Sequence, residues 1–227
     1  MDNKILETIK EFKPISIFVY GSQASQSTNG KSDYEIGIIF DEKNYVNRKE
    51  IQRHIQDKNY NVFPFKLNEV QNGTIDTPFQ KNIYLASMIS GNAKTIYGEE
   101  IIEQLPMPKI SKQDLLMDTS FNLGYALSAV RLMKENLLEL AEEFFYKSMF
   151  YATRNLYFVK FKKVLSGYNN IFAHSKKLDM PQEYRELLEI GNKLRNEQSV
   201  EFDKSLYYKN ISYINKFVIS EIEKIEE

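Results

Sequence analysis

Two acidic side chains at the start of an apolar segment are the residues best placed to do chemistry. Asp33 and Glu35 are two positions apart and lead into the apolar run 36–40. Residues i and i+2 of a β-strand lie on the same face, with Cα atoms roughly 6.5–7 Å apart. Because two carboxylates at that separation repel each other unless a positive charge lies between them, the pair predicts a divalent-cation site. Mg²⁺, which takes oxygen ligands and substrate phosphates together, is the expected ion.

A glycine and a serine precede this acidic pair and suggest what the metal would serve. Gly21-Ser22 follows the β-rich run 15–20, and a polar loop separates it from the carboxylates. Glycine lets the chain turn sharply, which brings backbone amides close to an anion, and the serine hydroxyl adds a donor for a phosphate oxygen. Phosphate donors at the end of one strand and a metal-binding pair on the next predict a site for a nucleoside triphosphate with magnesium.

The same residues form a motif. Gly21-Ser22 followed by Ser32-Asp33-Tyr34-Glu35 resembles the motif of the nucleotidyltransferase superfamily, which includes DNA polymerase beta and the minimal nucleotidyltransferases. The Asp-X-Glu form, with its Asp twelve residues after the glycine, resembles that of the kanamycin nucleotidyltransferases. The segment 178–184 and the helical second half are similar to the substrate-binding or HEPN-type bundles that accompany such catalytic domains.

The resemblance implies transfer of a nucleoside monophosphate from a triphosphate, ATP being expected, to a hydroxyl group, with release of pyrophosphate. Asp33 and Glu35 would be the catalytic residues that hold the magnesium bridging the phosphates. Gly21, Ser22 and Ser32 would bind the nucleotide. The expected acceptor is a small hydroxylated molecule, with antibiotics among the candidates.

Three positions depart from the superfamily pattern and keep other functions open. Many members carry a third carboxylate on a neighbouring strand, but the run 60–65 offers only Asn61, which cannot act as a base. Ser25 stands where relatives often place a phosphate-binding Arg, and Gly124 stands where the kanamycin enzymes have a general-base Glu. A catalytically degenerate nucleotide-binding or antitoxin-like regulatory module is therefore one alternative, and nucleotidylylation of a protein is another.

A predicted helix over residues 137–164 carries further candidates. Lys147 and Arg154 are seven positions apart and so lie on nearly the same helix face, with Tyr151 between them. We expect Lys147 to bind the nucleotide and to supply the positive charge that Ser25 lacks. Tyr151 and Arg154 are candidates for the acceptor site.

The same helix also offers two carboxylates. Glu142 and Glu143 are candidate bases for the acceptor hydroxyl. The competing interpretation is a solvated helix face on which Glu143 and Lys147 form an ordinary i, i+4 pair. His174 lies in a loop-like context and follows Arg154 too distantly to match the Arg-and-His spacing of HEPN ribonucleases, which disfavours a ribonuclease toxin.

Two differently built halves must position these residues, and together they predict an α+β protein. Residues 1–108 are expected to form a nucleotidyltransferase domain, a small mixed sheet with flanking helices, and residues 109–227 a substrate-binding all-α bundle. The run 106–108 contains two prolines and is the expected linker. Strands are predicted over 15–20, 35–40 and 60–65, and helices over 5–12, 47–58, 78–90, 113–133, 137–164, 181–195 and 205–225.

The amino-acid composition disfavours several classes of protein. The chain has 227 residues, and 30 Lys+Arg against 31 Asp+Glu give a formal net charge of −1. That balance gives no sign of a nucleic-acid partner, which would favour a basic surface. The chain has no cysteine, which excludes disulfides. Because it also has only two histidines, any metal site must be built from oxygen ligands. No apolar run approaches the roughly 18–20 residues that cross a bilayer, so we expect a cytoplasmic protein with no membrane partner, and we leave a homodimer open.

Overall fold

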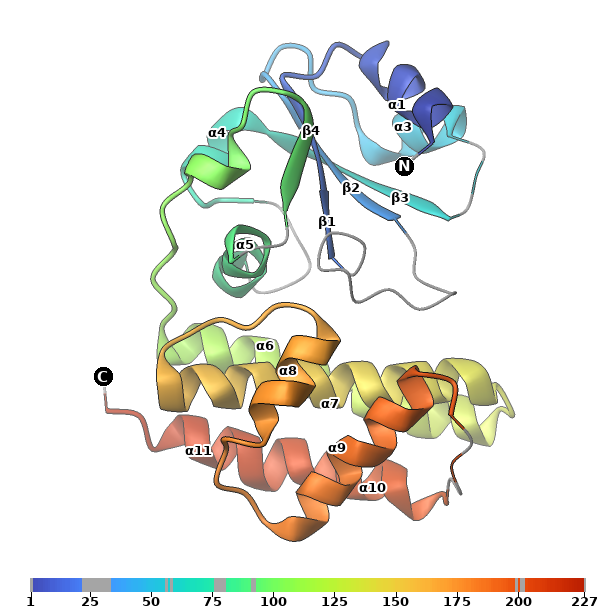
Figure 1. Ribbon diagram of the computed structural model, residues 1–227, viewed down its shortest axis with the longest axis vertical. Coiled ribbons are helices and arrows are strands. Elements are labelled where there is room, and N and C mark those ends of the chain that lie inside the picture. Colours follow the sequence, from blue (N-terminus) through green and yellow to red (C-terminus); the bar gives the residue numbers. More distant parts are fainter. Residues whose placement is uncertain are drawn as a thin grey trace. The chain divides into compact units, whose positions relative to one another are not determined.

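The computed structural model describes residues 2–21, 34–55, 57, 59–75, 81–90, 93–198, 200 and 203–226. It divides into two units, Met1–Lys109 and Ile110–Glu227, which Figure 1 shows in sequence colours. The first unit contains a β-sheet with helices, and the second contains helices, so the predicted α+β class with a helical second half is confirmed. Among the described residues, no helix is both long and apolar enough to span a membrane.

A mixed four-stranded sheet forms the centre of the first unit. Its strands are β1 (Ser16–Tyr20), β2 (Tyr34–Phe40), β3 (Tyr60–Lys66) and β4 (Lys94–Gly98), in the order β3-β2-β1-β4. β1 pairs antiparallel with both β2 and β4, whereas β2 and β3 are parallel. The three predicted strands are confirmed. β4 was not predicted, because this edge strand is mostly exposed and lacks an apolar run.

Helices cover both faces of this sheet (Figure 1). On one face lie α1 (Asn3–Lys10) and α3 (Arg48–His54), which contribute Ile9 and Ile51 to a buried cluster with β1, β2 and β3. The second cluster, on the opposite face, includes residues of three further segments: α4 (Leu67–Gln71), α5 (Lys81–Ile89) and η1 (Ile102–Gln104). The hydrophobic core of the first unit is therefore split by the sheet into two layers.

The alternation of side chains along β2 decides which face Glu35 occupies. Ile36, Ile38 and Phe40 are fully buried in the cluster with α1 and α3. Because successive side chains of a strand point to opposite faces, Glu35 and Ile39 project toward the side that carries α4 and α5. Ile39 is indeed buried in that second cluster.

The second unit begins with two long helices, α6 (Lys112–Lys134) and α7 (Leu138–Phe161), joined by the short connection 135–137. Ser111 and Asp114 form a capping box at the start of α6, each side chain accepting a hydrogen bond from the other residue's backbone amide. The remaining segments are α8 (Tyr168–Ser175), α9 (Gln182–Arg195), α10 (Ser205–Ser212), the π-helix η2 (Tyr213–Val218) and α11 (Ile219–Glu223).

One helix of the second unit corrects an expectation from sequence. His174 was expected in a loop, but it lies in α8, where its Nδ1 is 2.9 Å from the carbonyl oxygen of Asn170 and its ring packs edge-on against Tyr157. The helix starts directly after Gly167, the last residue of the preceding loop, which has a φ of 77°. Its short, partly polar sequence does not show a helical period that could be recognised locally.

Gly37 on β2 provides a test of this packing. A Cβ at this position would lie 2.0 Å from Cζ of Phe18, whose ring occupies the space above the glycine. We expect Gly37→Ala to lower the free energy of unfolding by about 1–3 kcal/mol, because a filled core accommodates an added methyl group only by displacing its neighbours. Denaturant unfolding followed by circular dichroism measures the change.

Gly124→Ala is the matched control for that experiment. Among the described residues, nothing outside the adjoining backbone of α6 lies within 4 Å of a Cβ built on Gly124, which is on the exposed side of this helix. This substitution should raise the stability by up to about 1 kcal/mol, since alanine is the better helix former. Equal stability of Gly37→Ala and the wild-type protein would contradict the packing described here.

Candidate active site

The fold brings Gly21 and Glu35 into direct contact. Tyr20 and Glu35 are cross-strand partners in the antiparallel β1–β2 pair, and Gly21 follows Tyr20 at the end of β1. A Cβ on Gly21 would lie 1.7 Å from Oε2 of Glu35, and the φ of Gly21 is +72°. The position therefore requires glycine for two reasons: the backbone is left-handed, and the carboxylate fills the space a side chain would need.

Three polar side chains form a row across the sheet beside this contact. Tyr20 on β1, Glu35 on β2 and Asn61 on β3 are paired in register. Partners on adjacent strands share a face, so a hydroxyl, a carboxylate and a carboxamide lie next to one another. Asn61 thus occupies the place directly beside Glu35 where a third carboxylate could have stood.

Tyr20 contributes a neutral hydroxyl to this row. Its side chain is buried, and its hydroxyl lies 2.6 Å from the hydroxyl of Tyr84 on α5. Burial raises the pKa of Tyr20 well above its usual value, Tyr84 and Glu35 raise it further, and Arg48 lowers it. Tyr20 therefore stays protonated at physiological pH, and it can take part in hydrogen bonds but does not ionise.

Arg48 belongs to the same neighbourhood, although no motif in the sequence indicates it. It is the first residue of α3, and its guanidinium carbon lies 4.5 Å from the ring centroid of Phe63 on β3. Its Nη2 lies 3.4 Å from Oδ1 of Asn61. The sequence showed only a polar helix here, because the proximity arises when α3 packs against β3.

Several predicted site residues fall outside the part of the chain that the structure describes. These are Ser22, Ser32 and Asp33. Of the predicted acidic pair Asp33 and Glu35, the structure therefore describes only Glu35. Among the described residues, no group of three or more His, Asp or Glu side chains is arranged to hold a metal ion.

In the second unit, Lys147 and Glu143 form the i, i+4 ion pair that was the competing interpretation of this helix face. Burial alone would lower the pKa of Lys147, but the hydrogen bond and the charge of Glu143 outweigh it, so that the pKa lies above its usual value. Glu142 has a different neighbour, Tyr207. Burial, with a further contribution from the charge of Glu142, raises the pKa of Tyr207 to about 12. The two candidate bases thus have different surroundings.

Arg154 is held in a buried polar network. Its Nη2 lies 3.0 Å from Oδ2 of Asp118 on α6, and the two side chains are only 11% and 7% exposed. Oδ2 of Asp118 also accepts hydrogen bonds from Asn122 at 3.1 Å and Asn155 at 2.7 Å. The guanidinium of Arg154 also lies 4.9 Å from the ring centroid of Tyr151. The predicted proximity of Tyr151 and Arg154 is thus observed, but the guanidinium already has a carboxylate partner.

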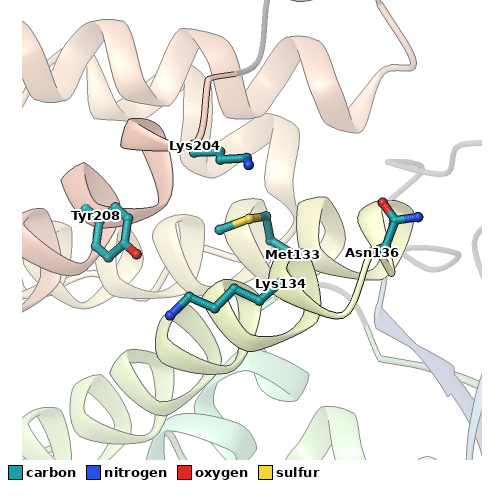
Figure 2. Close-up of a pocket in the computed structure, with 5 residues that line it drawn as sticks. All are labelled: Met133, Lys134, Asn136, Lys204 and Tyr208. Atoms are coloured by element: carbon teal, nitrogen blue, oxygen red, sulfur yellow. The ribbon is translucent and has the colours of Figure 1, made fainter.

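A pocket of about 440 Å³ lies elsewhere in the second unit (Figure 2). Figure 2 shows Lys134 and Lys204 approaching it from opposite sides and Tyr208 at one end. None of the predicted site residues that the structure describes lines it. The complete lining is Met133, Lys134, Asn136, Lys204 and Tyr208.

Comparison with known proteins assigns the first unit to a class. Residues 3–95 match the family described as Polymerase beta, Nucleotidyltransferase. This range contains Gly21, Glu35 and Asn61, and the predicted relationship to the nucleotidyltransferase superfamily is confirmed for this part of the chain. A search of curated proteins finds no match.

One solved structure is similar over almost the full length of the chain. It is the spectinomycin adenyltransferase AAD(9) from Enterococcus faecialis, crystallised with ATP and spectinomycin. The TM-score is 0.59 with 14% sequence identity, and the match covers 99% of this chain and 100% of the other. At this identity the likeness establishes a shared fold, which includes the helical second half.

The network around Asp118 leads to a stability prediction. We expect Asp118→Asn to lower the free energy of unfolding by about 3–5 kcal/mol, because it leaves the charge of Arg154 buried without a carboxylate. Lys147→Met removes the half-exposed pair with Glu143 and should cost less than about 1 kcal/mol. Thermal and urea unfolding of both variants measures the difference, and equal losses would show that the Asp118 network is not a structural element.

Proposed function

We propose that this protein is a magnesium-dependent nucleotidyltransferase that moves a nucleoside monophosphate from ATP to a hydroxyl group of a small acceptor. The acceptor oxygen forms a bond to the α-phosphorus, the bond from that phosphorus to the β-phosphate oxygen breaks, and pyrophosphate leaves. The hydroxyl proton passes to a base. The single observation that carries the proposal is the contact between the Glu35 carboxylate and the backbone at Gly21, within a domain of the matching family.

The residues at this contact suit magnesium and a polyphosphate. Carboxylate oxygens are ligands that Mg²⁺ prefers, and Glu35 with Asp33 would hold it. When bound, the ion would neutralise negative charge on the reacting phosphates. Gly21 has no side chain between the Glu35 carboxylate and its own backbone, so a phosphate at the Gly21-Ser22 amides would lie close to a metal ligand. Ser22 and Ser32 would add hydroxyl donors.

The proton acceptor must be sought away from β3. Asn61 occupies the register position beside Glu35, and a carboxamide does not accept a proton at physiological pH. The roles expected for the second unit remain part of the proposal: Lys147 as a nucleotide ligand, Tyr151 and Arg154 as acceptor-binding residues, and Glu142 or Glu143 as the base.

The acceptor proposed here is a small hydroxylated molecule, with antibiotics as the first class to test. The structural neighbour is a spectinomycin adenyltransferase, which supports this choice through the shared fold. The replacement of a carboxylate by Asn61 favours the alternative of a nucleotide-binding regulatory module without turnover. Nucleotidylylation of a protein uses the same chemistry with a macromolecular acceptor.

Pyrophosphate release separates these three functions. ATP and Mg²⁺ are supplied with a panel of aminocyclitol and aminoglycoside antibiotics, other hydroxylated small molecules, and proteins. We expect release with a small acceptor, its loss when EDTA removes the metal, and its recovery with added Mg²⁺. Transfer to proteins alone would identify the macromolecular acceptor, and tight ATP binding without release across the panel would support the regulatory module.

Two substitutions test the site itself. We expect Glu35→Gln and Gly21→Ala each to lower the rate of pyrophosphate release by at least about 100-fold, since the first weakens the metal site and the second displaces the carboxylate. Glu7→Gln, in an exposed pair with Lys10 on α1, is the matched control and should keep the wild-type rate. A fully active Glu35→Gln protein would overturn the proposed site.

A further inference from the structure

The first unit carries an exposed cation, Arg48, in the neighbourhood of Glu35. Arg48 projects from the start of α3 toward β3, where Asn61 is the register partner of Glu35. Arg48 contacts Asn61, and Asn61 lies in one row across the sheet with Glu35 and Tyr20. The carboxylate, the hydroxyl and the guanidinium therefore belong to one site.

Two neutral groups orient this guanidinium. It lies over the face of Phe63, with 4.5 Å between the guanidinium carbon and the ring centroid. Its Nη2 approaches Oδ1 of Asn61 at 3.4 Å. Stacking on an aromatic face and an amide acceptor direct an Arg side chain without cancelling its charge.

The charge of Arg48 remains available to a ligand. Among the described residues, no carboxylate lies within ion-pair distance of Arg48, and its side chain is exposed. A carboxylate at position 61 would have neutralised the guanidinium at the very atom that Asn61 now contacts. The neutral side chain of Asn61 therefore leaves the positive charge of Arg48 in the neighbourhood of Glu35.

We infer that Arg48, oriented by Phe63 and Asn61, binds an anionic phosphate or carboxylate group of a substrate next to Glu35. This inference rests on the proposed function, since it places the anion on a substrate of that site. The planar fork of the guanidinium matches the paired oxygens of both groups. The anion belongs either to the triphosphate or to the acceptor, and a negatively charged acceptor would differ in class from polycationic aminoglycosides.

Calorimetric titration of three proteins distinguishes these sources. Arg48→Met removes the charge but keeps an unbranched stem over Phe63, and Arg53→Met removes another exposed Arg of the same helix as the matched control. Each protein is titrated with ATP·Mg²⁺, and then with inorganic phosphate in the presence of a saturating non-hydrolysable ATP analogue and Mg²⁺. Low ionic strength is used, because salt screens exposed charges.

A roughly tenfold or greater loss of ATP·Mg²⁺ affinity in Arg48→Met, but not in Arg53→Met, supports the inference and assigns the anion to the nucleotide. Unchanged ATP·Mg²⁺ affinity with a similar loss of phosphate affinity supports it and assigns the anion to the acceptor. Equal behaviour of the two variants in both titrations overturns it. If the wild-type protein binds ATP·Mg²⁺ while Arg48→Met matches Arg53→Met, the inference fails and the proposed function stands. If the wild-type protein binds neither ligand, both fail.

Discussion

The register between β1 and β2 is the constraint on which the candidate site depends. It places Glu35 opposite Tyr20 and therefore against Gly21, and no other residue than glycine fits there. The apolar residues of β2 hold this register, because a slip by one position would exchange the side chains between the two core layers and turn Glu35 toward α1 and α3. Packing of Ile36 and Ile38 on the opposite face thus orients the group that would do chemistry.

The charge balance of the site follows from a single position on β3. A carboxamide at Asn61 beside Glu35 removes one negative charge from the neighbourhood and accepts a hydrogen bond from Arg48. Because residue 61 is not a carboxylate, it cannot serve as a base on the sheet. The exposed guanidinium of Arg48, in contrast, favours an anionic ligand. The identity of residue 61 therefore bears on both the catalytic and the regulatory hypothesis.

A few buried polar residues connect the helices of the second unit. Asp118 on α6 collects Arg154 and Asn155 of α7, and the hydroxyl of Thr153 lies 2.8 Å from that of the buried Tyr213. Polar networks of this kind restrict how the helices pack, since each buried donor needs its acceptor in place.

The sequence by itself determined the strands β1 to β3, most of the long helices and the superfamily, because each depends on residue types at short, fixed spacings. It also indicated Gly21 and Glu35, since a motif is local. Only the tertiary structure added β4 and α8 and joined Arg48 to Asn61 and Asp118 to Arg154. These features depend on how segments far apart in the chain pack within a unit. The sequence around any one of these residues has no period that would indicate them.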